Sequence, residues 1–194
     1  MQMRDLGTCP LSTPRLRLRR LTVDDADQMF TNWASDPEVT KYLVWPAYTD
    51  KSALEEYLID SVAAYEDPAR YNWGIELATD GTLIGSIGVV DSDDDIAMKS
   101  VGYCLGRAWW GCGYASEALA CVIAYLIEQV GVNRVEARHD PANPASGRVM
   151  AKCGMRHEGI LRARDRSNQG VVDASMWAIL ACDYDATHPA VSGA

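Results

Sequence analysis

The most informative stretch of the chain is Gly102-Tyr103-Cys104-Leu105-Gly106-Arg107-Ala108-Trp109-Trp110-Gly111-Cys112-Gly113-Tyr114-Ala115-Ser116-Glu117-Ala118. It begins inside a predicted strand, residues 99–106, and crosses a turn that contains two further glycines. The helix predicted next, residues 115–130, has its apolar side chains three and four positions apart and ends at Gly131. The stretch therefore predicts a strand, a glycine-containing turn and a helix in direct succession.

The start of this predicted helix is suited to an anion. Its first backbone N–H groups have no partner within the helix, and the helix dipole is positive there. Gly111 and Gly113 carry no Cβ, so the backbone can approach phosphate oxygens closely. Neither the Gly-Lys-Ser/Thr of a Walker loop nor the third glycine of a dinucleotide-binding loop follows them. A tight turn without a ligand remains the alternative interpretation of these glycines.

A second informative segment follows a predicted strand at residues 133–138. It reads Asn143-Pro144-Ala145-Ser146-Gly147-Arg148-Val149-Met150-Ala151-Lys152-Cys153-Gly154-Met155. Together the two segments resemble the GNAT superfamily of acetyl-CoA-dependent N-acetyltransferases. The first is similar to that superfamily's pyrophosphate loop, Q/R-x-x-G-x-G/A, and the second to its N-x-x-S pattern followed by a basic residue. Residues 102–103 and 110–118 look most like the branch of ribosomal-protein N-terminal alanine and serine acetyltransferases.

This resemblance implies where acetyl-CoA binds. The backbone of Cys104 and Leu105 is expected to pair with the pantetheine arm like an additional strand. Clustered backbone amides are expected to hold the pyrophosphate; they belong to Trp110, Gly111, Cys112, Gly113, Tyr114, Ala115 and Ser116. Arg107, Arg148 and Lys152 are expected to neutralise phosphate charge, with exposed surface bases as the alternative interpretation.

The resemblance also implies two catalytic residues. Asn143 matches the family residue that hydrogen-bonds the pantetheine region, and Ser146 matches the one that donates a proton or hydrogen bond to the departing CoA thiolate. The alternatives are an asparagine turn before Pro144 and a serine helix cap. Ala108 departs from the family pattern, because it stands where Gln or Arg is usual. One side-chain contact to the phosphates is therefore missing.

The general base is not identified by the sequence. Acetyl transfer requires a group that takes the proton of the attacking amine. Many relatives carry a glutamate just before the Gly-Tyr of the central strand, whereas this chain has Lys-Ser-Val at residues 99–101. Asp91, Glu76 and His139 remain candidates, acting directly or through water. Direct transfer in a ternary complex is the expected mechanism.

The remaining patterns complete a single α/β domain. The predicted sheet is mixed, mostly antiparallel and of about six or seven strands, with helices on both faces. We expect an N-terminal extension at 1–13, the acetyltransferase domain at 14–184 and a polar tail at 185–194. Outside the segments above, the predicted strands are 15–19, 72–78, 82–90, 155–162 and 171–182, and the predicted helices begin near 22, 49 and 146. The acidic run at 91–95 is expected to be an exposed loop.

Length and composition agree with a globular cytoplasmic protein. The chain has 194 residues, a net charge of −9 and 48% apolar residues. Its longest apolar run, residues 118–127, is too short to span a bilayer, and residues 1–14 contain no secretory signal. An acidic chain without a sustained basic patch argues against nucleic-acid binding. Three scattered histidines give no metal-ligand pattern, so we expect no metal.

The acceptor is expected to be a primary amine on a protein N-terminus or a small molecule. Residues 21–99 hold 17 acids and 4 bases, and an acidic surface attracts an amine that is cationic before it loses its proton. In this family the first two helices, the aromatic loop at 42–48 and the loops after residues 90 and 162 determine specificity. Exposed aromatic side chains there could line an acceptor pocket or form a homodimer contact.

Two other classes of function stay open. A catalytically silent acyl-CoA-binding module on the same fold is suggested by the missing glutamate and by Ala108. A thiol-transfer protein is suggested by six cysteines, although none are spaced as Cys-x-x-Cys.

Overall fold

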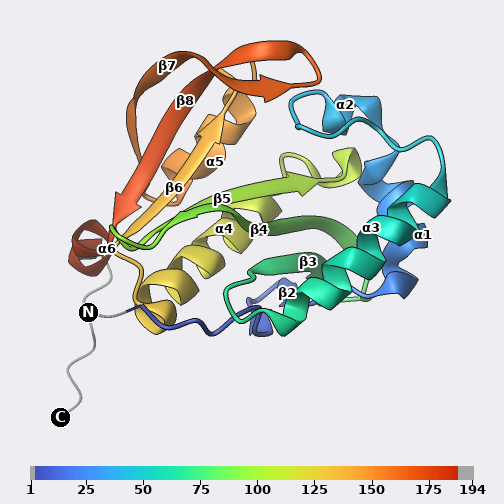
Figure 1. Ribbon diagram of the computed structural model, residues 1–194, viewed down its shortest axis with the longest axis horizontal. Helices are drawn as coiled ribbons and strands as arrows, with labels where there is room; N and C mark the ends of the chain where they lie inside the picture. Colours follow the sequence, from blue (N-terminus) through green and yellow to red (C-terminus); the bar gives the residue numbers. More distant parts are fainter. Residues whose placement is uncertain (1–2, 188–194) are drawn as a thin grey trace.

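A computed structural model describes residues 3–187, and Figure 1 shows its single twisted sheet. The strand order is β1-β2-β3-β4-β5-β6-β8-β7. The strands are β1 (Leu11–Ser12), β2 (Leu16–Arg19), β3 (Asn72–Leu77), β4 (Leu83–Asp93), β5 (Met98–Leu105), β6 (Arg134–His139), β7 (Arg156–Ser167) and β8 (Gly170–Leu180). The predicted α/β class is confirmed, with eight strands in place of six or seven.

The sheet is antiparallel except where β5 meets β6. These two strands pair in parallel only over Met98–Ser100 and Arg134–Glu136. Beyond those residues β5 continues with β4, and β6 continues with β8. The C-terminal halves of β5 and β6 therefore separate, and the sheet is split from the end at which both strands finish.

Helices cover both faces of the sheet (Figure 1). They are α1 (Ala26–Met29), α2 (Pro37–Thr40), α3 (Lys51–Ala63), α4 (Tyr114–Ala124), α5 (Pro144–Lys152) and α6 (Ala181–Thr187). Wider turns extend α4 through Val130, which gives the long helix that the sequence predicts. Here α4 and α5 share one face, and α1 and α3 share the other.

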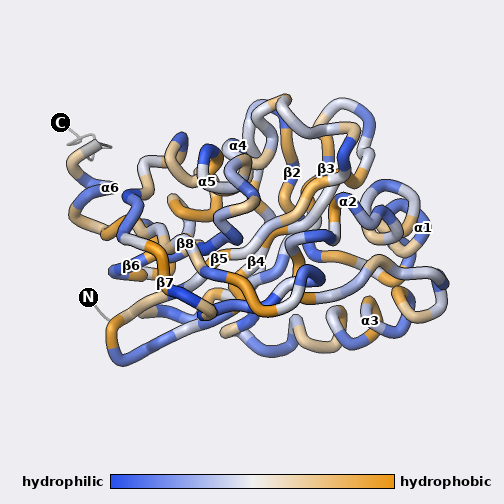
Figure 2. The backbone as a smooth tube through the Cα atoms, turned by 90° about the horizontal axis from the view of Figure 1, so that it is seen from above, coloured by the Kyte–Doolittle hydropathy of each residue, from blue (hydrophilic) through white to orange (hydrophobic). Residues whose placement is uncertain are grey.

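The side-chain alternation of the strands explains the two faces. Ile84 packs with α4 in the larger core, whereas its neighbour Leu83 packs with α1 and α3 in the smaller one. The central strands are mainly hydrophobic, and α3 alternates hydrophilic and hydrophobic turns (Figure 2). α3 contributes Leu54 and Leu58 to the smaller core, and α4 contributes Leu119 and Val122 to the larger one.

The segment predicted as an N-terminal extension is integrated into the domain. Trp73 Nε1 donates to the Cys9 carbonyl at 2.7 Å, and the Tyr125 hydroxyl donates to the Gly7 carbonyl at 2.8 Å. β1 then pairs with β2. These contacts satisfy polar groups of buried aromatic side chains, so a boundary at residue 14 would divide a continuous structure.

Two other expectations differ from the structure. β4 runs into the acidic segment as far as Asp93, because these residues pair with the start of β5. At the other end α6 continues through Thr187, past the predicted boundary at 184. The rest of the predicted tail, residues 188–194 with His188, lies outside the described residues.

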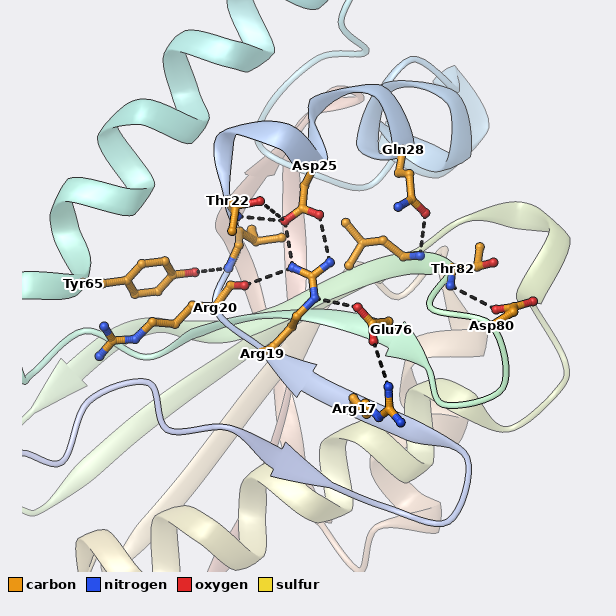
Figure 3. Close-up of polar contacts among 12 residues, drawn as sticks. Arg17, Arg19, Arg20, Thr22, Asp25, Gln28, Tyr65, Glu76, Asp80 and Thr82 are labelled. Carbon is orange, nitrogen blue, oxygen red and sulfur yellow. Dashed lines mark hydrogen bonds and ion pairs between the residues drawn. The ribbon is translucent and has the colours of Figure 1, made fainter.

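A buried charge cluster joins β2, β3 and the start of α1 (Figure 3). Arg19 donates to both oxygens of Asp25 at 2.8 Å and to Glu76 at 2.6 Å. Asp25 also accepts from the backbone N–H of Thr22, which begins the helical turn. Burial alone would raise the pKa of Asp25, but the bonds from Arg19 and Thr22 outweigh it and hold that pKa below its ordinary value.

Candidate active site

The split between β5 and β6 forms a cleft of about 560 Å³. One wall comes from the end of β5 and the start of α4, and the other from the end of β6 and from α5. Residues that follow α2 close one end of it. The separated strands leave backbone groups at the cleft edge that a bound molecule could pair with.

The glycine turn lines the cleft at the end next to the start of α4. Gly111 and Gly113 have φ angles of +76° and +83°, a region that glycine enters without the strain other residues incur. α4 begins immediately afterwards at Tyr114, so its free N–H groups face this end. The predicted loop residues that line the cleft are Trp110, Gly111, Gly113, Tyr114, Ala115 and Ser116. Cys112 does not line it.

Arg15 holds this turn from behind, a role the sequence analysis missed. Its Nη1 donates to the Cys112 carbonyl at 3.0 Å, and its guanidinium stacks on the Tyr114 ring at 4.5 Å. Its Nε pairs with Glu117 at 2.6 Å, and Thr13 donates to the same carboxylate. Burial raises the pKa of Glu117, but these bonds from Thr13 and Arg15 outweigh it, so the group stays ionised and paired.

Replacing Arg15 with alanine is expected to weaken acetyl-CoA binding about tenfold. The change leaves an unpaired Glu117 carboxylate beside the helix start and frees the Cys112 carbonyl. Titration calorimetry of acetyl-CoA measures the loss. Arg17→Ala is the matched control, because Arg17 lies two residues further along the chain, in β2, and contacts Glu76 instead. Equal affinity of the two variants would contradict the assignment, whereas recovery in Arg15→Ala/Glu117→Gln would support it.

β4 lies very close to β5 on the side away from the cleft. A Cβ on Gly85 would lie 2.2 Å from the Cys104 carbonyl oxygen, so only glycine allows this strand spacing. Cys104 and Leu105 line the cleft, as the predicted pantetheine contact requires. The Leu105 carbonyl already accepts from Trp110 Nε1 at 2.8 Å. A ligand would therefore pair with backbone groups of this edge other than the Leu105 carbonyl.

Two of the three predicted phosphate-binding bases lie in the cleft. Arg148 and Lys152 are one turn apart on α5, and neither forms an ion pair within the described part of the chain. Arg107 does not line the cleft, because it pairs with Asp36 at 3.0 Å. Among the three predicted bases, only the two on α5 therefore line the cleft.

Ser146 meets Tyr103 across the cleft. Their hydroxyl oxygens are 2.9 Å apart, and the Tyr103 hydroxyl also donates to the Ser146 carbonyl at 3.1 Å. Burial raises the pKa of Tyr103 well above its ordinary value, so its proton is retained at neutral pH. Asn143 also lines the cleft, directly before α5. Tyr103 was missed as a functional residue, because the pairing depends on how β5 and α5 are placed.

The three candidate bases are not equivalent in the structure. Glu76 is held by Arg19, and Asp91 accepts from Ser92; neither lines the cleft. His139 does line it, with Nε2 facing the Trp177 indole N–H at 3.2 Å and Nδ1 facing the Asp140 carbonyl at 2.8 Å. The carboxylates that line the cleft are Glu38 and Asp140, which the sequence analysis did not single out as bases.

The expected acceptor region is only partly exposed. Trp33 is fully buried, and Asp36 is paired with Arg107. The chain after residue 162 continues as strand to Ser167, so no separate loop starts there. Within the aromatic loop, Tyr42 does reach the cleft.

The thiols of Cys104 and Cys153, which lie at or near the cleft, are poorly suited to nucleophilic chemistry. Burial raises the pKa of Cys153 to about 11 and raises that of Cys104 as well. Cys153 donates to the Ser116 carbonyl at 3.2 Å, which joins α5 to α4. Within residues 3–187, no cluster of three or more metal-ligating side chains is found.

Residues 15–156 match the acetyltransferase (GNAT) domain family. The chain belongs to this family. As a GNAT member it is an N-acetyltransferase, and its acetyl donor is acetyl-CoA. The split sheet and the glycine turn described above are therefore the parts of a GNAT acetyltransferase domain.

Among individual proteins, the chain is similar to two curated bacterial enzymes. Uncharacterized N-acetyltransferase p20 of Bacillus licheniformis is 32% identical over 176 residues, which cover 90% of this chain and 97% of that protein. [Ribosomal protein uS5]-alanine N-acetyltransferase of Escherichia coli is 36% identical over 59 residues, 30% of each chain. The predicted resemblance to the GNAT superfamily is confirmed.

A solved structure shares the fold. The microcin C7 self immunity acetyltransferase MccE, in complex with acetyl-CoA and AMP, superposes with a TM-score of 0.77 at 19% identity, covering 87% of this chain and 93% of that one. At this identity the likeness shows the common fold alone. Within residues 3–187 of our GNAT chain, none of the helices combines the length and hydropathy needed to cross a membrane.

Proposed function

We propose that this acetyltransferase moves the acetyl group of acetyl-CoA directly to a primary amine, with both substrates bound at once. The observation that carries the proposal is the cleft itself, which has free helix amides at one end and the Tyr103–Ser146 hydroxyl pair within it. If acetyl-CoA lay between them, the helix amides would bind its phosphates and the hydroxyl pair would contact its thioester sulfur. An acceptor would then enter from the end closed by the residues after α2.

Acetyl-CoA would occupy the cleft along β5. The edge at Cys104 and Leu105 would pair with the pantetheine amides, assisted by Asn143. The turn and the start of α4 would hold the pyrophosphate, with Arg148 and Lys152 supplying positive charge. This arrangement compensates for Ala108, because the phosphates gain two bases from α5.

The reaction needs no covalent enzyme intermediate. The amine nitrogen attacks the thioester carbonyl carbon, the C–N bond forms, and the C–S bond breaks as the electrons leave with sulfur. Ser146 donates its hydroxyl proton to the thiolate and takes the proton of Tyr103 through their hydrogen bond, and Tyr103 regains a proton from water when the products leave, so that both hydroxyl groups are restored. The proton of the amine leaves through water near Glu38 and Asp140, which line the acceptor end.

The proposed acceptor is an amine that is cationic in solution, on a protein N-terminus or a small molecule. Glu38 and Asp140 supply negative charge where it would enter. The similarity to a ribosomal-protein alanine N-acetyltransferase supports the protein N-terminus as one candidate. Lys41 lies among the same residues and would favour an acceptor that also carries a carbonyl or carboxylate.

Acetyl-CoA turnover, read as release of free thiol, tests this proposal. The panel comprises amino-terminal peptides, polyamines, amino acids, aminoglycosides and neutral arylamines. We expect turnover with one cationic class, and unchanged turnover in Cys112→Ala, whose exposed side chain does not line the cleft. Activity on neutral arylamines alone would contradict the acceptor class. Tight acetyl-CoA binding without any turnover would instead indicate a silent acyl-CoA-binding module.

A further inference from the structure

The turn between β7 and β8 is fastened to the segment that follows α2. Both hydrogens of the Asn168 side-chain amide are used, at 2.8 Å to the Thr40 carbonyl and at 2.7 Å to the Trp45 carbonyl. The backbone N–H of Asn168 donates to the Leu43 carbonyl at 3.0 Å. Figure 1 shows this hairpin turn reaching the chain near α2. One residue thus holds residues 40–45 at three carbonyls, and we call this set of bonds the clasp.

The same segment is attached at a second point. The Tyr42 hydroxyl donates to the Ala142 carbonyl at 3.1 Å, in the loop between β6 and α5. Residues 40–45 therefore run as a bridge between the hairpin turn and that loop, across the acceptor end of the cleft. At the ends of the bridge Thr40 is buried and Trp45 packs against the smaller core, whereas Val44 between them is largely exposed. The middle of the bridge is therefore held mainly by hydrogen bonds.

The bridge separates two hollows. Lys41, Tyr42 and Asp140 line the cleft and also line a second hollow of about 510 Å³ on the hairpin side. Gln169, directly after Asn168, lines the second hollow. The second hollow is a shallow surface depression, and Lys41 and Tyr42 are the bridge residues that lie between it and the cleft. A displaced bridge would therefore widen the cleft toward this side.

We propose that Asn168 is a positioning residue that determines acceptor specificity. It holds the bridge closed, so that an amine on a slender chain passes beside Tyr42 and a bulky ring-bearing amine does not. The inference rests on the proposed function, in which the acceptor enters at this end. Asn168 lines neither hollow and so acts only through residues 40–45.

Hydrogen exchange of the whole chain, followed by mass spectrometry, tests the clasp without any acceptor. Asn168→Asp keeps the size of the side chain but places oxygens against the Thr40 and Trp45 carbonyls. We expect exchange across residues 40–48 to become about tenfold faster, with exchange in α4 unchanged. Asn168→Ala removes the donors without adding charge and should act in the same direction. Asp80→Ala is the matched control, because Asp80 caps the turn of another hairpin by accepting from Thr82.

Thiol release with two amines tests the specificity. n-Butylamine represents a slender acceptor and tyramine a ring-bearing one. In Asn168→Asp we expect the ratio of kcat/KM for tyramine to kcat/KM for n-butylamine to rise about tenfold, because KM for tyramine falls. The KM for acetyl-CoA should stay within about twofold of the wild-type value. An unchanged ratio, unchanged exchange, or faster exchange throughout the chain would overturn the proposal. If the wild type acetylates neither amine while retaining acetyl-CoA binding, the proposed acceptor class fails, and the exchange experiment still decides whether Asn168 holds the bridge.

Discussion

Replacing Ser146 with alanine is expected to lower kcat about 100-fold while leaving acetyl-CoA affinity nearly unchanged. The serine hydroxyl is 2.9 Å from that of Tyr103, and burial keeps the tyrosine protonated. Without Ser146 the departing thiolate must take its proton from water. Thiol release at saturating acetyl-CoA and acceptor measures kcat, and calorimetry measures the affinity. Ser61→Ala is the matched control, because Ser61 is a buried helical serine on the opposite face of the sheet.

A second substitution distinguishes a proton relay from two independent contacts. If Ser146 and Tyr103 act as one unit, Ser146→Ala/Tyr103→Phe should lose little more activity than Ser146→Ala alone. Losses that multiply would indicate separate roles. A fall in the melting temperature that parallels the fall in kcat would instead show that the pair only holds α5 against β5.

Replacing Arg19 with methionine is expected to lower the free energy of unfolding by about 3–5 kcal/mol. The change leaves the Asp25 side chain, which is 6% exposed, with no guanidinium partner, and Glu76 loses its shorter ion pair. Urea denaturation at pH 7 measures the cost. Arg17→Met is the matched control, since Arg17 is 61% exposed and 3.7 Å from Glu76. It should cost less than about 1 kcal/mol, and equal costs for the two would contradict this account.

The pH dependence of stability gives the same cluster a second test. The pKa of Asp25 is lowered in the folded protein, so its stabilisation is present above the unfolded carboxyl pKa of about 4 and is lost as pH falls through the lower folded value. In Arg19→Met the buried carboxyl has no guanidinium and gains by binding a proton. The stability difference between wild type and variant should therefore shrink between pH 7 and pH 4. A difference independent of pH would argue for a packing effect.

The local parts of the site could be predicted because their chemistry is local. The turn with Gly111 and Gly113 needs residues without a Cβ, and an amphipathic helix follows directly, so neighbouring residues contain the information. The position of Asn143 directly before α5 could be predicted for the same reason, because Pro144 and the helix follow it immediately. These motifs identify the family and the cofactor end of the cleft.

The remaining parts depend on contacts between distant segments. Arg15 reaches Glu117 because β2 lies beside the start of α4, and Asn168 reaches Thr40 because a hairpin turn meets the bridge. The sequence cannot show such pairings, because the residues next to an arginine or asparagine in the chain do not identify the distant group that its side chain contacts. Arg107 illustrates the reverse case: its place in the motif suggested a phosphate contact, and the fold pairs it with Asp36.

The short parallel contact between β5 and β6 also bears on how long the protein survives in a cell. Only three residue pairs, from Met98↔Arg134 to Ser100↔Glu136, join the two halves of the sheet by strand pairing. A donor molecule bound between the separated strand ends would stabilise the folded protein by mass action and lower the fraction of unfolded chain that proteases cleave. The rate of degradation of this acetyltransferase would then fall as acetyl-CoA accumulates, so that the nutritional state of the cell adjusts the amount of enzyme as well as its saturation.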